Sequence, residues 1–166
     1  MADAIPNALH ILGAAAWLGP QFLMFIAVMP ALRTLEDTGR ARAMAVLTVR
    51  FNYLAWGALV LLLLTGLDRI ASRASDFNLF DVRYGTILVV KMAFVAAAIT
   101  LTALHSFVVG PRLLALQKEA ATGGSPAAGM AALRRQSMML SIANLLVGLT
   151  IVYLGALLRN PSFSFT

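Results

Sequence analysis

Ionisable side chains interrupt the long apolar stretches of this 166-residue chain, and three of them are both of its histidines, His10 and His105, and one lysine, Lys91. A neutral imidazole can ligate haem iron or copper. A lysine can pair with a carboxylate, bind a propionate, or serve as a ligand when it is deprotonated. Because ionisable groups are costly in hydrocarbon and mark functional sites there, these three residues are the first candidates for chemistry.

The stretches that hold them are long enough to cross a membrane. Apolar residues make up 60% of the chain and charged residues 12%, and the mean hydropathy is +0.84. A membrane span needs about 20 mostly apolar residues, and four such stretches occur, at about 5–32, 46–67, 84–109 and 137–158. The sequence therefore predicts an all-α membrane protein, a four-transmembrane-helix bundle that occupies residues 1–166 as a single integral membrane domain.

The first stretch could also be read as a cleavable signal peptide. It has no basic residue before it, and it is longer than the apolar region of a signal peptide. We expect a retained first helix.

Basic residues predict the orientation of the bundle. The segments joining the first two and the last two stretches carry eight: Arg33, Arg40, Arg42, Arg50, Arg112, Lys118, Arg134 and Arg135. The opposite side carries four: Arg69, Arg73, Arg83 and Arg159. The positive-inside rule then places both termini outside a bacterial inner (plasma) membrane, which the protein crosses several times. The net charge of +6 forms no patch, so the expected partner is the lipid bilayer and not nucleic acid.

Helical spacing sorts the polar residues into faces and depths. Offsets of 3, 4, 7 and 11 return to one face of a helix, which groups His10 with Trp17 and Gln21, and Lys91 with His105. At 1.5 Å per residue, His10 lies about 8 Å, Lys91 about 10 Å and His105 about 30 Å below the outer surface. The two histidines are thus too far apart to be the two axial ligands of one haem.

The outer group is predicted to contain His10, Lys91 and Asp68. His10 and Lys91 are candidate cofactor-binding residues, and His10 is also a candidate metal ligand. The alternative is a structural ion pair between Lys91 and Asp68. Trp17 lies too deep for an interfacial belt, and either packs in the core or forms a wall beside a planar cofactor.

The inner group is predicted to contain His105 and Met24 as candidate metal ligands, with Gln21, Met138 and Ser141 near them. Thioethers with a histidine suit Cu(I). Alternatively, the methionines fill gaps in apolar packing and His105 lies at the headgroup boundary. The absence of cysteine excludes disulfides, thiolate metal sites and covalent haem attachment.

Two features outside the spans remain. The segment Gly110 to Gln136 contains Gly123-Gly124-Ser125-Pro126 and is expected to be a solvated linker. A short repeat relates Pro30-Ala31-Leu32-Arg33 to Pro111-Arg112-Leu113, as two hairpins about an axis along the membrane normal would. Chance explains so short a match equally well.

Several of these residues follow a known pattern. Leu9-His10, Trp17-Leu18-Gly19 and Pro30-Ala31-Leu32-Arg33 resemble the first helix of the copper-resistance protein D family. Thr65-Gly66-Leu67, and Tyr84-Gly85 followed by Leu88 and Lys91, resemble its next two helices. The resemblance implies copper uptake or tolerance across the inner membrane. The chain has Pro20 where the pattern usually has a second glycine, and it has no Met-rich or His-rich metal motif.

A second resemblance is to the bacterial haem-pathway protoporphyrinogen oxidases, which have a first-helix histidine and a third-helix lysine. It implies that His10 ligates haem b and that Lys91 assists a porphyrin site. The chain has Tyr84-Gly85-Thr86 where that family has a tryptophan and a histidine. Copper and haem b thus both stay open as cofactors, and whether the protein is an enzyme is undecided. A homo-oligomer, or an accessory subunit of a larger membrane complex, is a further alternative.

Overall fold

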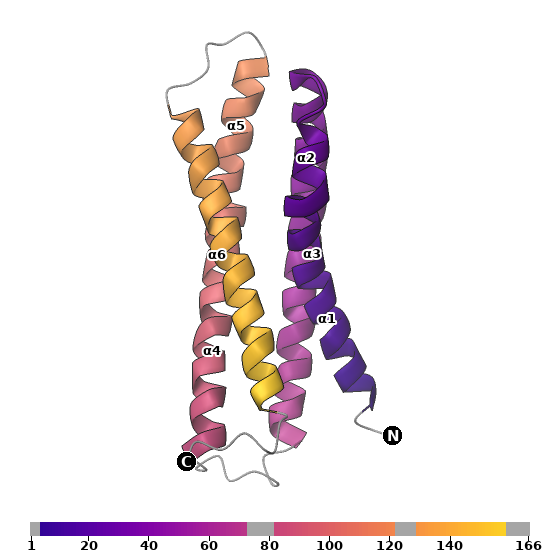
Figure 1. Ribbon diagram of the computed structural model, residues 1–166, viewed down its shortest axis with the longest axis vertical. Coiled ribbons are helices and arrows are strands. Elements are labelled where there is room, and N and C mark those ends of the chain that lie inside the picture. The colour runs from indigo at the N-terminus through magenta and orange to yellow at the C-terminus, as the bar shows by residue number, and fades with distance from the viewer. Residues whose placement is uncertain (1–3, 73–81, 122–128, 159–166) are drawn as a thin grey trace.

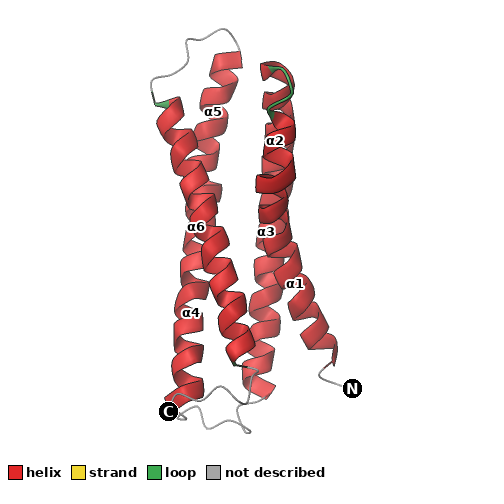
Figure 2. Ribbon diagram, in the orientation of Figure 1, coloured by secondary structure: helices red, strands yellow, loops and turns green. Residues whose placement is uncertain are grey.

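A computed structural model of the protein describes residues 4–72, 82–121 and 129–158, which are helical except for short turns (Figures 1 and 2). The first span consists of α1 (Ala4–Leu23), a short π-helix η1 (Met24–Val28) and α2 (Met29–Leu32). The second is α3 (Asp37–Ser72). The third consists of α4 (Val82–Ala103), a second π-helix η2 (Leu104–Val109) and α5 (Gly110–Ala121), and the fourth is α6 (Met130–Leu157). All four spans are long and apolar enough to cross a membrane, so the predicted all-helical membrane fold is confirmed.

The spans pair as two antiparallel hairpins. α1 packs along α3, and α4 packs along α6, as Figure 1 shows. The hairpins meet where α1 contacts α6 and where α3 contacts α5. The first turns of α1 and α4 and the last turns of α3 and α6 lie at one end, here named the His10 end, and η2 lies toward the opposite, His105 end.

Most large apolar side chains point away from the bundle. Ile26 is 73% exposed, Val89 69% and Phe107 65%, and similar residues occur along all four spans. Exposure of so much apolar surface to water would be unfavourable, whereas the acyl chains of lipids can solvate it. The central cluster of buried residues is small and consists of Trp17, Leu18, Ala58, Leu59 and Ala98.

Gly148 on α6 lets the two hairpins approach closely. A Cβ atom at this position would lie 2.5 Å from Leu18 Cδ2 and 2.7 Å from Trp17 Cζ3. Both distances are shorter than carbon atoms tolerate, so a larger residue here would require the Leu18 and Trp17 side chains to shift. Small residues have this function at many contacts between membrane helices.

Several helices extend beyond the apolar stretches. α3 begins at Asp37, and not near residue 46, and its 36 residues span about 54 Å, against about 30 Å for the hydrocarbon core. An ion pair between Asp37 and Arg40 lies in its first turn. Gly110–Ala121 is likewise helical, and α6 begins at Met130. The prediction of a linker from Gly110 to Gln136 was therefore wrong for both of these parts. The polar ends of these helices can extend into solvent. The Gly123–Pro126 break, Arg73 and Arg159 lie outside the described residues.

The two π-helices support the internal repeat. The Met29 N–H donates to the Met24 carbonyl, and the Gly110 N–H donates to the His105 carbonyl. Each donor directly precedes a proline, Pro30 or Pro111. A proline has no N–H and its ring crowds the carbonyl four residues earlier, which accounts for a wider turn at this point. The same distortion therefore occurs at the same position in the first and third spans.

The repeat also relates the candidate residues. Pro30 and Pro111 are 81 positions apart, and so are His10 and Lys91. Met24 and His105 are separated by the same 81 positions, as are Gln21 and Thr102. His10 and Lys91 thus occupy equivalent places in the two hairpins.

Candidate functional site

His10 lies on α1 and faces α3 within its own hairpin. Its Nδ1 is 2.8 Å from the Thr65 hydroxyl oxygen. The neighbouring residue on α3, Gly66, leaves space beside the ring, because a Cβ atom there would lie 3.6 Å from His10 Cε1. A threonine and a glycine near the end of the second span therefore adjoin the imidazole.

The hydrogen bonds of Thr65 define which nitrogen of His10 is available. The Thr65 hydroxyl oxygen is 2.7 Å from the Leu61 carbonyl, which can only accept, so the single hydroxyl proton points there. Thr65 must then accept from His10, which places the imidazole proton on Nδ1. The lone pair remains on Nε2, and no hydrogen bond among the described residues engages that nitrogen. Metal-ligating histidines typically have this arrangement, with one ring nitrogen donating to a fixed oxygen.

Lys91 lies in the equivalent place of the second hairpin. A Cβ atom on Gly155 of α6 would lie 3.6 Å from Lys91 Nζ, which repeats the relation between His10 and Gly66. The charges of Lys91 and Arg69 both act on the His10 ring, so the three basic residues share one region at the His10 end. We call His10, Thr65, Lys91 and Arg69 the basic layer.

The predicted carboxylate of this layer is not beside Lys91. Asp68 is exposed, and among the described residues no salt bridge joins it to Lys91. Thr65, one turn earlier on α3, faces the seam between the helices. Sequence analysis missed a further polar group, Asn7, whose buried Oδ1 has no hydrogen-bond partner in the described part of the chain. Its spacing of three residues from His10 was the available signal.

His105 differs from His10 because both of its ring nitrogens face serine hydroxyls. Nε2 is 3.4 Å from Ser137 Oγ, and Nδ1 is 3.3 Å from Ser141 Oγ. Ser141 Oγ also donates to the Ser137 carbonyl at 3.0 Å. This set ties η2 to α6, and its geometry favours a hydrogen-bonding role for His105 over a role as a metal ligand.

The other predicted members of the inner group are dispersed. Met138 is 53% exposed on the outside of α6, so its predicted place beside His105 was wrong. Gln21 donates from Nε2 to the Trp17 carbonyl at 3.0 Å. Met24 is half-buried in η1. Among the described residues, no three histidine, aspartate or glutamate side chains are grouped so that they could hold a metal ion.

Trp17 is part of the core between the hairpins. It is only 5% exposed, and its ring packs on Gly148. It lies two turns from His10 on the same helix face, about 10 Å along the axis. Packing therefore accounts for its position, while its edge is directed from α1 toward the second hairpin.

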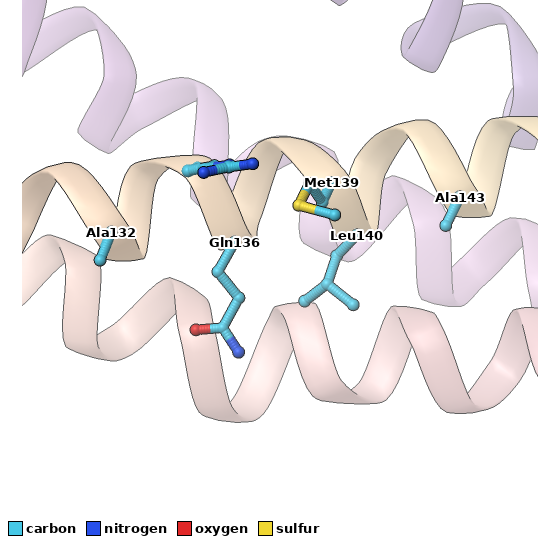
Figure 3. Close-up of a pocket in the computed structure, with 6 residues that line it drawn as sticks. Ala132, Gln136, Met139, Leu140 and Ala143 are labelled. Atoms are coloured by element: carbon cyan, nitrogen blue, oxygen red, sulfur yellow. The ribbon is translucent and has the colours of Figure 1, made fainter.

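A surface hollow of about 510 Å³ lies elsewhere, along the first half of α6. Its lining consists of Ala132, Arg135, Gln136, Met139, Leu140 and Ala143. Figure 3 shows that these side chains all project from one helix, with Gln136 and Leu140 directed toward a neighbouring ribbon. The hollow contains neither histidine nor Lys91, and it is separate from the basic layer.

A protein-family model described as Copper resistance protein D matches residues 45–158. The chain belongs to this family. The matched range includes most of α3 and all of α4, η2, α5 and α6, so Thr65, Lys91 and His105 lie inside it and His10 lies before it. No curated protein and no solved structure matches the chain. Membership of the copper resistance protein D family agrees with the resemblance in the second and third spans, and it connects the protein with copper resistance.

Proposed function

We propose that this member of the copper resistance protein D family handles copper, in transport or tolerance, through the basic layer at the outer face of a bacterial inner membrane. His10 supplies the metal ligand through Nε2, and copper is the cargo. The observation that carries the proposal is the hydrogen bond from His10 Nδ1 to Thr65, which fixes the ring and leaves Nε2 with its lone pair. Imidazole is a suitable ligand for copper.

The second group of the site is Lys91, from the other hairpin. Its charge and that of Arg69 act at the His10 ring, and they favour a negatively charged partner there. Copper that arrives with an anionic ligand matches this environment better than a bare cation does. Lys91 then binds the anion while His10 binds the metal.

The test is copper binding by purified protein in mild detergent, with metal analysis and Cu(I) titration. His10→Ala should abolish the copper-dependent phenotype and the bound copper. Lys91→Met keeps the length of the side chain and removes the charge, and it should weaken binding in a chloride-dependent or carboxylate-dependent way. Unchanged copper content and unchanged copper sensitivity in His10→Ala would refute the proposal.

A second candidate is a haem b-binding membrane oxidoreductase, and the same charges favour it. A free imidazole Nε2 is an axial ligand of haem iron in many proteins, and the Lys91 ammonium can pair with a propionate. Expression with adequate haem supply followed by an optical spectrum separates the candidates. A Soret band that His10→Ala removes would favour haem, and a spectrum without one would exclude it.

A further inference from the structure

Four polar atoms are buried in the middle of the bundle without a protein partner. They are Trp17 Nε1, Trp56 Nε1, Gln21 Oε1 and Asn144 Oδ1, none of which has a hydrogen bond to any described residue. Buried polar groups nearly always have a partner, either protein or ordered water. An unpaired buried group is unfavourable by the full loss of its hydration, so four such atoms need an explanation.

Two of the four residues share one level at the contact between α1 and α6. Trp17 packs on Gly148, which fixes the register of these antiparallel helices. Gln21 lies one turn from Trp17 toward the His105 end, and Asn144 lies one turn from Gly148 in the same direction. The register therefore brings Gln21 and Asn144 to one level.

The other two spans reach the same level. The Asn144 Nδ2 group donates to Thr102 Oγ1 on α4 at 3.3 Å, and Thr102 is 6% exposed. One turn further toward the His105 end, Ser106 donates to Asn52 on α3. This bond sets the register of α3 against the third span and places Trp56, one turn from Asn52, opposite Thr102. The Trp56 ring also contacts Phe107, with centroids 5.5 Å apart.

We define the central layer as Trp17, Gln21, Trp56, Thr102 and Asn144, which come from all four spans. Its unpartnered atoms are two indole N–H donors and two amide oxygen acceptors. A molecule that satisfies both kinds must accept and donate, and it must be small because Trp17 and Thr102 are closely packed. An apolar ligand satisfies none of these atoms, and a bare cation would leave both indole N–H groups unpaired.

We infer that the central layer binds ordered water within the membrane, held between the indole N–H groups and the amide oxygens. A buried water typically makes two to four hydrogen bonds to polar groups. The four unpartnered atoms of the layer can supply such bonds. Polar groups then continue from the serines at His105, through Asn144 and Thr102, to Trp17. Hydration of the layer extends a polar path from the His105 end to the middle of the bundle.

The chain contains two tryptophans only, and both belong to the central layer, so indole N–H signals report on it directly. The experiment uses full-length protein with ¹⁵N-labelled tryptophan in lipid nanodiscs. Trp17→Phe and Trp56→Phe variants assign the two indole resonances. We expect both N–H groups to show magnetisation transfer from water, although Trp17 is 5% exposed.

Gln21→Leu tests whether this water is the bound one. It replaces the side-chain amide by an apolar group of similar size, and it should remove the water signal at Trp17. Because the change also removes the hydrogen bond from Gln21 Nε2 to the Trp17 carbonyl, the readout is the indole water signal and not the melting temperature. Thr100→Val is the matched control, because Thr100 is exposed and its hydroxyl bonds only to the Ala96 carbonyl. It should leave the water signals unchanged.

Two results would overturn the inference. One is the absence of water transfer to both indole groups in the folded wild-type protein. The other is a Gln21→Leu variant whose water transfer to the Trp17 indole N–H equals that of the wild-type protein. Copper binding is not a readout here, so a failure of the inference is distinguishable from a failure of the proposed copper site.

Discussion

Thr65→Val gives the sharpest test of the basic layer. Valine has nearly the shape of threonine but no hydroxyl, so the change removes the acceptor for His10 Nδ1–H while the packing of α3 stays similar. The imidazole then has an unpaired donor, at a loss of about 1–3 kcal/mol, or it rotates away from α3. In either case Nε2 is no longer fixed in the orientation that binds the metal.

The expected magnitude follows from the role of such supporting bonds. Loss of a hydrogen bond to a ligating histidine typically weakens metal binding about 10–100-fold, and about 1.4 kcal/mol corresponds to tenfold. We therefore expect Thr65→Val to bind Cu(I) at least about tenfold more weakly than wild type, in a competition titration against a chromophoric chelator. Thr65→Ser keeps the hydroxyl and should remain close to wild type.

The comparison with His10→Ala completes this design. If His10→Ala abolishes binding and Thr65→Val equals wild type, then the Thr65 hydroxyl does not orient the ligand and the tautomer assigned to His10 is wrong. If both variants equal wild type, the basic layer is not the copper site. Circular dichroism and size-exclusion profiles of each variant show whether the helices and the assembly are intact.

Three further predictions concern the frame of the site. Gly66→Ala should leave copper binding near wild type, because its Cβ would lie 3.6 Å from His10 Cε1, whereas Gly66→Leu should displace the ring and abolish binding in the same titration. Gly148→Ala should destabilise the bundle by about 1–3 kcal/mol through overpacking, as measured by thermal unfolding in detergent. Gly57→Ala, with nothing within 4 Å of the new Cβ, is its control, and equal stability of the two variants would contradict the close contact. The orientation in the membrane can be tested with single cysteines at exposed Thr38 and Ser72, because the chain has no cysteine of its own. We expect an impermeant thiol reagent added outside intact cells to label Ser72→Cys and not Thr38→Cys. The reverse labelling would mean that the predicted topology is inverted.

The fold was predictable because hydrophobic length alone defines spans. Four apolar stretches of sufficient length gave four helices, and helical periodicity grouped His10 with Trp17 on one face. The ends were less predictable. A helix that leaves the bilayer continues as long as its residues tolerate helical geometry, and the polar residues after Gly110 and around Asp37 do so.

The partners of the candidate residues were harder to predict. Asp68 and Thr65 lie three residues apart on nearly the same face of α3, so spacing alone could not distinguish which one meets His10. The angle at which two helices pack decides this, and it depends on Gly66 and on the neighbouring apolar side chains. Met138 illustrates the same limit, because a change of rotation by one residue moves a side chain from the seam to the lipid.

The two π-helices have a consequence for helical phase. An α-helix turns by about 100° per residue, and a π-helix accommodates one additional residue without breaking the chain of hydrogen bonds. Met24–Val28 and Leu104–Val109 each act as such an insertion, so the residues before and after them are rotated relative to a continuous α-helix. Deletion of one residue from either segment would restore regular winding and turn one half of that span by about 100°. His10 or Lys91 would then face lipid while the far half of the span kept its place, so the orientation of the basic layer depends on an irregularity located more than two turns away.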